Sequence, residues 1–333
     1  MTTTLSREIV FESTATATLV DVELPPLQPR QVLAKTIASV ISPGTELTAF
    51  TQRFAPDTNW ETYARLPFRP GYSSVGRVVA VGPGVDSVSV GHHVLIEASH
   101  ASHHLLDAVE CQLVPAGIDP ESAAWFALAQ IAFRGFWNTD TRIGGSLVIV
   151  GAGPIGQMVV RWASAAGLAR ITVVDPVTAR LTHALDGGAH EVFDSALGDI
   201  ATPLHIEGEG SPTTYIDTTG NPQVFADVLR RAPRFGRVVL LGDAGDPREQ
   251  RLTSDVLFKD LSIVGAFGAQ VREGCPNARV RQLFLDLLDT SRFSVDRMIT
   301  HRFRPEDCQA AYDLLANARQ STMGTAFVWE GAS

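Results

Sequence analysis

The stretch that decides the fold is residues 146–156, Ser-Leu-Val-Ile-Val-Gly-Ala-Gly-Pro-Ile-Gly. An apolar run typical of a buried strand leads directly into Gly151, Gly153 and Gly156, which have the spacing G-x-G-x-x-G. Glycine permits a tight turn at the first position, close approach of backbone N–H groups to a pyrophosphate at the second, and close helix–strand packing at the third. The stretch therefore predicts a strand, a turn and a helix that together bind a dinucleotide.

Neighbouring residues strengthen this prediction, because the hexapeptide alone also occurs for purely structural reasons. The helix expected to begin at Pro154, with Ile155 in its first turn, would direct the partial positive charge of its N-terminus at the phosphates. The next strand ends at Asp175, where a carboxylate can accept hydrogen bonds from both hydroxyls of the adenosine ribose. Repulsion between this carboxylate and a 2′-phosphate favours NAD over NADP. Arg180 leaves an alternative open, since it could stack on adenine, pair with a phosphate or be a solvated helix residue.

Outward from this stretch, apolar strands alternate with amphipathic helices over residues 120–268. Such strands are buried on both faces, which indicates a parallel sheet with helices on each side. Ligands bind outside the carboxyl ends of these strands, so the residues after each strand are expected to complete the cofactor site. The predicted cofactor-binding residues beyond the glycines are Asp175, Pro176, Arg180, Thr218, Thr219, Leu241, Gly242, Ala266 and Phe267.

The rest of the chain has a different pattern. Residues 8 to about 115 contain short β-branched runs separated by proline and glycine, typical of an antiparallel, partly barrel-like sheet. One helix is expected over residues 121–138 behind an N-cap at Asp119. The fold class is therefore α/β. A doubly wound Rossmann domain is expected at residues 119–268, and a mostly β domain is expected from residues 1–118 and 269–333.

Composition excludes several classes of partner. The 333 residues include 27 basic and 36 acidic side chains, giving a net charge of −9, and the sequence has no basic stripe with which to displace counterions from a nucleic acid. The N-terminal stretch lacks the basic start of a secretory signal. The longest apolar run, residues 123–137, is interrupted by Gln130 and Arg134 and is shorter than the roughly 20 residues that cross a bilayer. We expect a cytoplasmic protein with neither a nucleic-acid nor a membrane partner.

Several motifs resemble those of one protein family. Pro43-Gly-Thr-Glu46 stands where the family has C-G-T-D, and Pro70–Gly76 reads P-G-Y-S-S-V-G where it has P-G-H-E-x-x-G. With the glycine motif, these residues make the chain similar over nearly its whole length to the medium-chain dehydrogenase/reductase superfamily, the zinc alcohol dehydrogenase-like proteins. The resemblance implies that both chain ends form a GroES-like catalytic domain into which the Rossmann domain is inserted. Residues 42–46, S-P-G-T-E, resemble a zinc-independent branch that includes bacteriochlorophyllide hydroxyethyl dehydrogenase-like proteins and related dehydrogenases of secondary metabolism.

The departures from the family concern zinc. The family's catalytic zinc is held by a cysteine, a histidine and a cysteine or aspartate. These positions fall on Pro43 (or on Ser42 with a shift of one), on Tyr72 and near Leu128, and none of these side chains holds zinc. The four-cysteine lobe expected around residues 97–111 is reduced to Cys111. We therefore expect a member without zinc.

Five histidines need separate consideration: His92, His93, His100, His103 and His104. Their spacing does not place three of them on one face of a single helix or strand. We expect most of them to be solvated loop residues and predict no metal site.

Without zinc, side-chain donors must stabilise the oxygen of the reacting alcohol or ketone. By the resemblance, Thr45 matches a hydroxyl proton-relay position, Glu46 a nearby carboxylate, and Tyr72 replaces the histidine ligand beside the nicotinamide. His100 follows the predicted strand 93–97 and could face the same cleft. We expect Tyr72 and Thr45 to orient the substrate oxygen, with Glu46 or His100 taking part in proton transfer. Structural roles remain open for each: a cap for Thr45, an arginine partner for Glu46, a cleft wall for Tyr72 and, as the favoured reading, a purely structural place for His100.

The expected function is hydride transfer between NAD and a polar secondary alcohol or ketone, in secondary metabolism. A quinone or enoyl reductase is the first alternative, although such proteins usually take NADP, against which Asp175 argues. The second is a dinucleotide-binding sensor that has lost catalysis together with zinc. The expected partner is a small-molecule substrate, and the resemblance implies a homodimer.

Overall fold

The computed structural model describes residues 4–204, 213–268 and 274–329. The chain divides into two compact units. The first unit comprises Met1–Ala127, Arg281–Thr290 and Val295–Ser333, and the second comprises Leu128–Val280 and Ser291–Ser294. Within the described ranges, no helix is long and apolar enough to cross a bilayer.

The second unit is built on a parallel sheet. Its strands are β8 (Ser146–Val150), β9 (Arg170–Val174), β10 (Glu191–Phe193), β11 (Thr214–Asp217), β12 (Arg237–Leu240) and β13 (Ser262–Gly265). They are ordered β10-β9-β8-β11-β12-β13, and every neighbouring pair is parallel. The order reverses between β8 and β11, which makes this point the ligand-binding crevice of a doubly wound sheet. The predicted Rossmann fold is confirmed.

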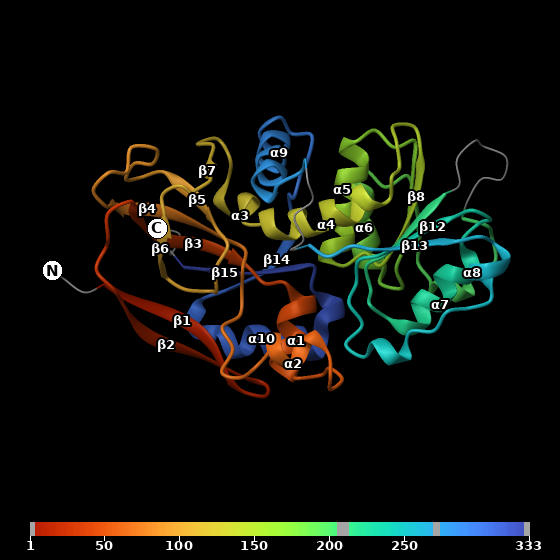
Figure 1. Ribbon diagram of the computed structural model, residues 1–333, viewed down its shortest axis with the longest axis horizontal. Helices are drawn as coiled ribbons and strands as arrows, with labels where there is room; N and C mark the ends of the chain where they lie inside the picture. The colour runs from red at the N-terminus through yellow and green to blue at the C-terminus, as the bar shows by residue number, and fades with distance from the viewer. Residues whose placement is uncertain (1–3, 205–212, 269–273, 330–333) are drawn as a thin grey trace. The chain divides into compact units, whose positions relative to one another are not determined.

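Helices cover both faces of this sheet. They are α5 (Pro154–Ala165), α6 (Thr178–Asp186), α7 (Pro222–Arg231) and α8 (Asp255–Phe258). Figure 1 shows α5 and α6 on one side of the parallel strands and α7 and α8 on the other. Val148, Tyr215 and Val238 of the strands pack with Phe225 and Leu229 of α7 in one apolar core. The continuous apolar strands of the sequence are thus explained by burial on both faces.

The helix expected over residues 121–138 is in fact two helices, α3 (Pro120–Ala123) and α4 (Phe126–Asn138). Asp119 is the N-cap as predicted, and its carboxylate accepts from the Ser122 N–H at 2.9 Å. The interruption has a local cause. Ser73 Oγ donates to the Ala124 carbonyl at 2.6 Å and accepts from the Ala127 N–H at 3.3 Å, so a hydroxyl replaces the helical ladder there.

The first unit contains a mixed sheet and a separate antiparallel pair. The pair is β1 (Thr4–Ser13) with β2 (Thr16–Leu24). The sheet strands are β3 (Gln31–Val40), β4 (Ser74–Val81), β5 (His93–Ile96), β6 (His103–Asp107), β7 (Leu113–Val114), β14 (Ile299–Phe303) and β15 (Gly324–Val328). Their order is β14-β15-β3-β4-β5-β7, with β6 also paired to β3, and all pairs except β14–β15 are antiparallel.

Helices α1 (Pro43–Thr51), α2 (Asn59–Tyr63) and α10 (Cys308–Ala318) belong to the first unit, and α9 (Asn277–Asp289) contains the point at which the chain passes between the units. Helix α10 packs against α1 and β2 (Figure 1). Its Tyr312 ring meets Phe11 at 4.7 Å between centroids and Phe50 at 5.4 Å. This aromatic core fixes α10 beside α1 and so determines where the Tyr312 hydroxyl lies.

Candidate functional site

Five polar side chains meet in the interior of the first unit. We call them the polar cluster: Ser39, Glu46, His100, Tyr312 and Trp329. They come from β3, α1, the loop after β5, α10 and the residue that follows β15. The His100 side chain is 0% exposed and that of Glu46 is 1% exposed. The cluster therefore has to satisfy its hydrogen bonds without solvent.

One arrangement of protons satisfies the whole cluster when Glu46 is ionised. Tyr312 donates to Glu46 Oε2 at 2.6 Å. His100 Nε2 lies 3.1 Å from the same oxygen, and Nε2 carries a proton because a carboxylate can only accept. His100 Nδ1 then accepts from Ser39 Oγ at 2.8 Å, while Ser39 accepts from Trp329 Nε1 at 3.0 Å. Every side-chain N–H and O–H of the cluster thus has an acceptor within it.

Glu46 also organises the start of α1. The Ser42 side chain makes no capping bond at the N-cap, and the Ser42 N–H instead donates to Glu46 Oε1 at 2.7 Å. Both carboxylate oxygens are therefore engaged inside the protein. The partner of Glu46 is His100 and not an arginine, and Thr45 lies within the first turn of the helix, not at its cap.

The two hydroxyls expected to orient the substrate oxygen lie beside this cluster. Tyr72 Oη is 3.4 Å from Thr45 Oγ1, and both residues are partly exposed. Burial raises the pKa of the Tyr72 phenol well above its ordinary value, and the nearby Glu46 carboxylate raises it further, while hydrogen bonds to Ser42 and Thr45 oppose the shift. Tyr72 therefore stays protonated at neutral pH and can donate a hydrogen bond.

The Tyr72 loop rests directly on His100. Gly71 has φ of +100°, and a Cβ there would lie 2.7 Å from the His100 ring. The backbone N–H of His100 donates to the Pro70 carbonyl at 2.7 Å. His100 thus links the buried carboxylate of Glu46 to the backbone that carries Tyr72.

The expectation that most of the five neighbouring histidines are solvated loop residues is wrong, because His100 and His104 are buried and His93 and His103 lie in β5 and β6. His100 is 0% and His104 is 8% exposed, whereas His92 is exposed. The β6 strand, which pairs with β3, carries His104 into the interior. Burial lowers the pKa of His104 to about 4, so this imidazole is neutral at pH 7.

In the second unit, the three glycines of residues 151–156, which we call the glycine turn, have different environments. Gly151 has φ of +94°, and a Cβ at Gly156 would lie 2.0 Å from the Gly151 carbonyl oxygen, so internal packing requires both. A Cβ at Gly153 would meet no described atom within 4 Å. Pro154 is the first residue of α5, with Ile155 partly buried in the same turn. Open space above Gly153 at a helix N-terminus is what a bound pyrophosphate requires.

Asp175 lies at the end of β9 and is 5% exposed. Its Oδ2 accepts from the Ala152 N–H at 2.7 Å, and its Oδ1 accepts from the Val177 N–H at 2.8 Å. Arg180 Nη1 is 3.8 Å from Oδ2, and Pro176 is exposed beside it. The backbone bonds hold the carboxylate against the glycine turn, and each oxygen keeps a second lone pair with which to accept a ribose hydroxyl.

The remaining predicted cofactor residues follow β11, β12 and β13. Thr218 Oγ1 donates to the Val150 and Gly151 carbonyls at 3.0 and 3.1 Å, which ties the end of β11 to the glycine turn. Thr219 Oγ1 donates to Asp217 at 2.6 Å. Leu241, Gly242, Ala266 and Phe267 line a cavity of about 560 Å³ at the ends of β12 and β13, which we call the β12–β13 cavity.

The side chains at the family's zinc positions do not fit zinc. Pro43 is the first residue of α1, Tyr72 offers a protonated phenol, and Leu128 is fully buried. Among the described residues, no three His, Cys, Asp or Glu side chains gather as a metal ion would require. His100 and Glu46, which could otherwise serve as ligands, are hydrogen-bonded to each other.

Sequence reasoning missed Ser39, Tyr312 and Trp329, which carry no motif and meet Glu46 and His100 through the tertiary fold alone. It also missed Arg134 in the β12–β13 cavity. A signal for Arg134 existed, because a charged residue interrupts an otherwise apolar helix.

Comparisons with known proteins agree with this fold. The family model of the alcohol dehydrogenase GroES-like domain matches residues 28–146, and that of the zinc-binding dehydrogenases matches residues 154–289. An L-threonine 3-dehydrogenase of Xanthomonas euvesicatoria pv. vesicatoria is 26% identical over 339 residues, covering 90% of this chain and 93% of the relative.

Solved structures show the same architecture. A dehydrogenase of the zinc-binding type from Sinorhizobium meliloti 1021, bound to NADP, superposes with a TM-score of 0.80 at 21% identity, covering 98% of this chain and 100% of that one. An Escherichia coli alcohol dehydrogenase in complex with NADH gives a TM-score of 0.78 at 20% identity and covers 98% and 99%. The chain therefore belongs to the medium-chain dehydrogenase/reductase superfamily, as an oxidoreductase of the zinc-type alcohol dehydrogenase-like kind.

Proposed function

We propose that the protein is a zinc-independent, NAD(H)-dependent dehydrogenase that interconverts a polar secondary alcohol and its ketone. The observation that carries this proposal is the open space at Gly153, between two glycines that internal packing explains. Gly151, Gly153 and Gly156 would hold the pyrophosphate, and Asp175 would hold the adenosine ribose. When bound, NAD supplies the hydride acceptor of such a reaction and NADH the hydride donor.

The preference for NAD over NADP rests on Asp175. Its carboxylate is fixed by two backbone N–H groups, so it cannot turn away from a ribose at the end of β9. A 2′-phosphate there would place two like charges side by side in a buried setting, where repulsion is strong. Arg180 is 3.8 Å from the same carboxylate and offsets part of this charge.

Tyr72 and Thr45 are proposed to handle the oxygen of the substrate. Tyr72 holds its proton at Oη at neutral pH, and its neighbour Thr45 can accept or donate at Oγ1. Such a pair can bind a carbonyl oxygen and stabilise the charge that develops on it during reduction. Pro43 and Leu128 stand at zinc-ligand positions of the family, so these hydroxyls would stabilise the substrate oxygen in place of zinc. The S-P-G-T-E sequence at residues 42–46 separately supports a role in secondary metabolism.

We assign positioning roles to Glu46 and His100 in place of the expected proton transfer. Both are buried, and their hydrogen bonds are filled by Tyr312, Ser39 and the Ser42 N–H. Their contact with the Tyr72 loop and with the start of α1 lets them fix the two hydroxyls in place. A filled network of this kind rigidifies the residues that it carries.

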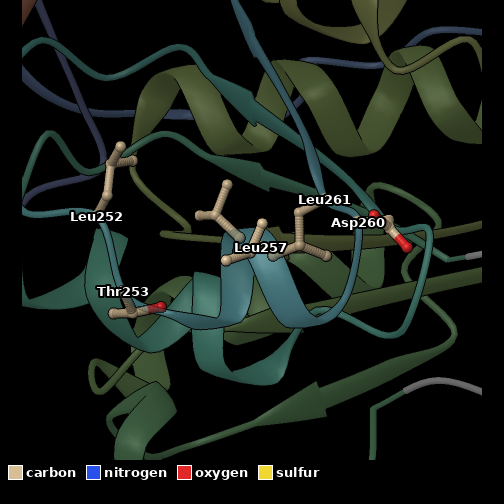
Figure 2. A pocket seen from close by; sticks show the side chains of 6 residues that line it. Leu252, Thr253, Leu257, Asp260 and Leu261 are labelled. Carbon is tan, nitrogen blue, oxygen red and sulfur yellow. The ribbon is translucent and has the colours of Figure 1, made fainter.

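A homodimer is proposed through the β13 edge of the parallel sheet. Strand β13 ends the order of described strands, so backbone groups on its outer side could pair with a second copy, apart from the Gly265 carbonyl, which accepts from Asn138. Exposed apolar side chains lie nearby: Leu252, Leu257 and Phe258 are each more than two-thirds exposed. A pocket of about 530 Å³ lies at α8. Leu252, Leu257 and Leu261 are among the residues that line it (Figure 2). Sedimentation of the wild-type chain and of a Leu257→Asp variant tests this, with the variant expected to be monomeric and a monomeric wild type refuting it.

The test of the proposed function begins with fluorescence titration of NADH and NADPH, in which NADH is expected to bind more tightly. Turnover is then measured with L-threonine and a panel of polar secondary alcohols and ketones, before and after treatment with a metal chelator. We expect turnover that the chelator does not change. Activity that is lost on chelation and restored by zinc would refute zinc independence, reduction of enones alone would favour an enoyl reductase, and NADH binding without any turnover would favour a sensor.

A further inference from the structure

Arg134 lies in the wall of the β12–β13 cavity, among residues that follow two strands of the parallel sheet. Its neighbours in this wall include Asn138, Leu241, Gly242 and Phe267. The residue is only 3% exposed, which is unusual for an arginine. A side chain of this kind needs partners for its charge and for its five N–H groups.

The partners of Arg134 account for one of its three nitrogens. Nη2 donates to the Cys275 carbonyl at 2.6 Å and to Asn277 Oδ1 at 2.7 Å. Nε and Nη1 are buried and have no hydrogen-bond partner among the described residues. Since Nε carries one N–H and Nη1 carries two, three donors remain unsatisfied.

The helix that carries Arg134 cannot shift to relieve this. At Gly135 a Cβ would lie 2.5 Å from Leu241, so α4 approaches the β12 end as closely as a glycine allows. Asn138 Nδ2 donates to the Gly265 carbonyl at 2.8 Å and ties the same helix to β13. Helix α4 is therefore fixed on both sides beside the cavity whose lining includes Arg134.

The charge of Arg134 is uncompensated as well. Nε and Nη1 have no carboxylate partner among the described residues, and Asp243, which also lines the cavity, is exposed. A guanidinium does not lose its proton in a protein, so this group cannot become neutral as a lysine or histidine would. Burial of an unpaired charge is costly, and an anion bound in the cavity removes that cost.

NAD held at the glycine turn would not provide this anion. Its pyrophosphate belongs to the glycine turn after β8, and β12 and β13 are the second and third strands away, roughly 10 and 14 Å at the usual strand spacing. Its nicotinamide amide is neutral and would leave the charge of Arg134 in place. Since neither the described residues nor NAD would supply this anion, the geometry points to another molecule.

We propose that Arg134 binds a carboxylate group of the substrate in the β12–β13 cavity, so that the polar alcohol or ketone of the proposed function is a hydroxy or oxo acid. That the bound molecule is a substrate rests on the proposed function. That it carries a carboxylate rests on the geometry of Arg134. Carboxylate oxygens accept charge-assisted hydrogen bonds from a guanidinium and neutralise it at the same time.

The test measures thermal unfolding of the full chain with saturating NADH while 3-hydroxybutyrate, its methyl ester, sodium chloride or inorganic phosphate is added at matched ionic strength. We expect 3-hydroxybutyrate to stabilise the wild type and the ester and chloride to have no comparable effect. The Arg134→Met variant should bind the carboxylate about tenfold or more weakly, and Arg134→Lys should retain part of the effect.

Arg161→Met is the matched control. Arg161 is also buried, on α5, but each of its guanidinium nitrogens has a carbonyl or amide oxygen as acceptor. Without any ligand, Arg161→Met should lower the unfolding temperature, whereas Arg134→Met should leave it unchanged or raise it.

The carboxylate site would be overturned by equal binding of acid and ester, by tighter binding of phosphate than of 3-hydroxybutyrate, or by equal loss of stability in both methionine variants. The absence of any carboxylate effect on the wild type would do so too. Failure of NADH to bind the wild type would instead refute the proposed dehydrogenase function. The carboxylate titration is therefore also run without NADH, which tests Arg134 independently of the cofactor.

Discussion

Glu46 and His100 in the polar cluster of the first unit and Arg134 in the second are all nearly inaccessible to solvent, yet they differ in whether the protein satisfies their hydrogen bonds. In the polar cluster, Tyr312, Ser39 and Trp329 meet the needs of Glu46 and His100, and no side-chain N–H or O–H is left over. Arg134 keeps two nitrogens without a partner at the wall of a cavity. The first arrangement is complete by itself and supports other residues, and the second is complete only with a ligand.

The same contrast recurs among the three glycines of the glycine turn. Internal packing explains Gly151 and Gly156, whereas nothing in the described chain occupies the space that a side chain at Gly153 would fill. Groups that the protein itself satisfies hold the structure, and groups that it leaves open bind the ligand. Each prediction below tests one side of this distinction, from the largest expected effect to the smallest.

Glu46→Gln should have the largest effect, a loss of about 3–5 kcal/mol in the free energy of unfolding. The amide NH₂ group would face the donors of Tyr312 and His100, so buried N–H and O–H groups would lose their acceptor. Chemical denaturation measures this loss. Glu12→Gln, at an exposed position, is the control and should be neutral. Equal stability of the two variants would mean that the cluster does not support the fold.

His104 is a buried group that lacks a hydrogen-bond partner but is not expected to bind a ligand. Its Nε2 has no partner, but burial lowers its pKa to about 4, so the ring avoids the cost of a buried charge by staying neutral. Between the ordinary pKa of 6.5 and about 4, the folded state binds fewer protons than the unfolded state, and stability falls as the pH falls. The shift corresponds to about 3 kcal/mol at most.

His104→Leu should therefore flatten the dependence of stability on pH between 7 and 4, while His92→Leu, at an exposed histidine, should leave it unchanged. Denaturant unfolding at several pH values provides the measurement. A curve for His104→Leu that parallels the wild type would show that this imidazole does not titrate as its burial implies.

Tyr72→Phe should separate function from stability. Its hydroxyl contacts Thr45 at a long 3.4 Å and also bonds to Ser42, so we expect the free energy of unfolding to change by no more than about 1 kcal/mol. Turnover of the ketone identified in the substrate panel should fall about 10²-fold, because a donor to the developing oxyanion is removed. Tyr63→Phe, on the partly exposed α2, is the control and should keep full turnover. Unchanged turnover in Tyr72→Phe would show that Tyr72 does not bind the substrate oxygen.

The sequence was sufficient to predict the parallel sheet because apolar strands and glycine spacing are local signals. Asp175 could be placed for the same reason, since its position is fixed by the end of one strand. The break between α3 and α4 was not predictable, because the Ser73 hydroxyl that causes it is far away in the chain.

The polar cluster could not be predicted from local patterns either. Glu46 and Tyr312 are 266 residues apart and meet because α10 packs on α1. Arg134 is the intermediate case. Its charge within an apolar helix was visible in the sequence, but the cavity beside it depends on two strands more than a hundred residues later.

The most direct test of this account is titration of NADH into Gly153→Ala, monitored by nicotinamide fluorescence, with the unfolding temperature measured on the same sample. Because a Cβ at Gly153 meets no described atom within 4 Å, the variant should be as stable as the wild type but bind NADH about tenfold or more weakly. Gly156→Ala, whose Cβ would lie 2.0 Å from the Gly151 oxygen, should instead be destabilised without any ligand. Wild-type affinity for NADH in Gly153→Ala would contradict the claim that the space at this glycine is where the cofactor binds.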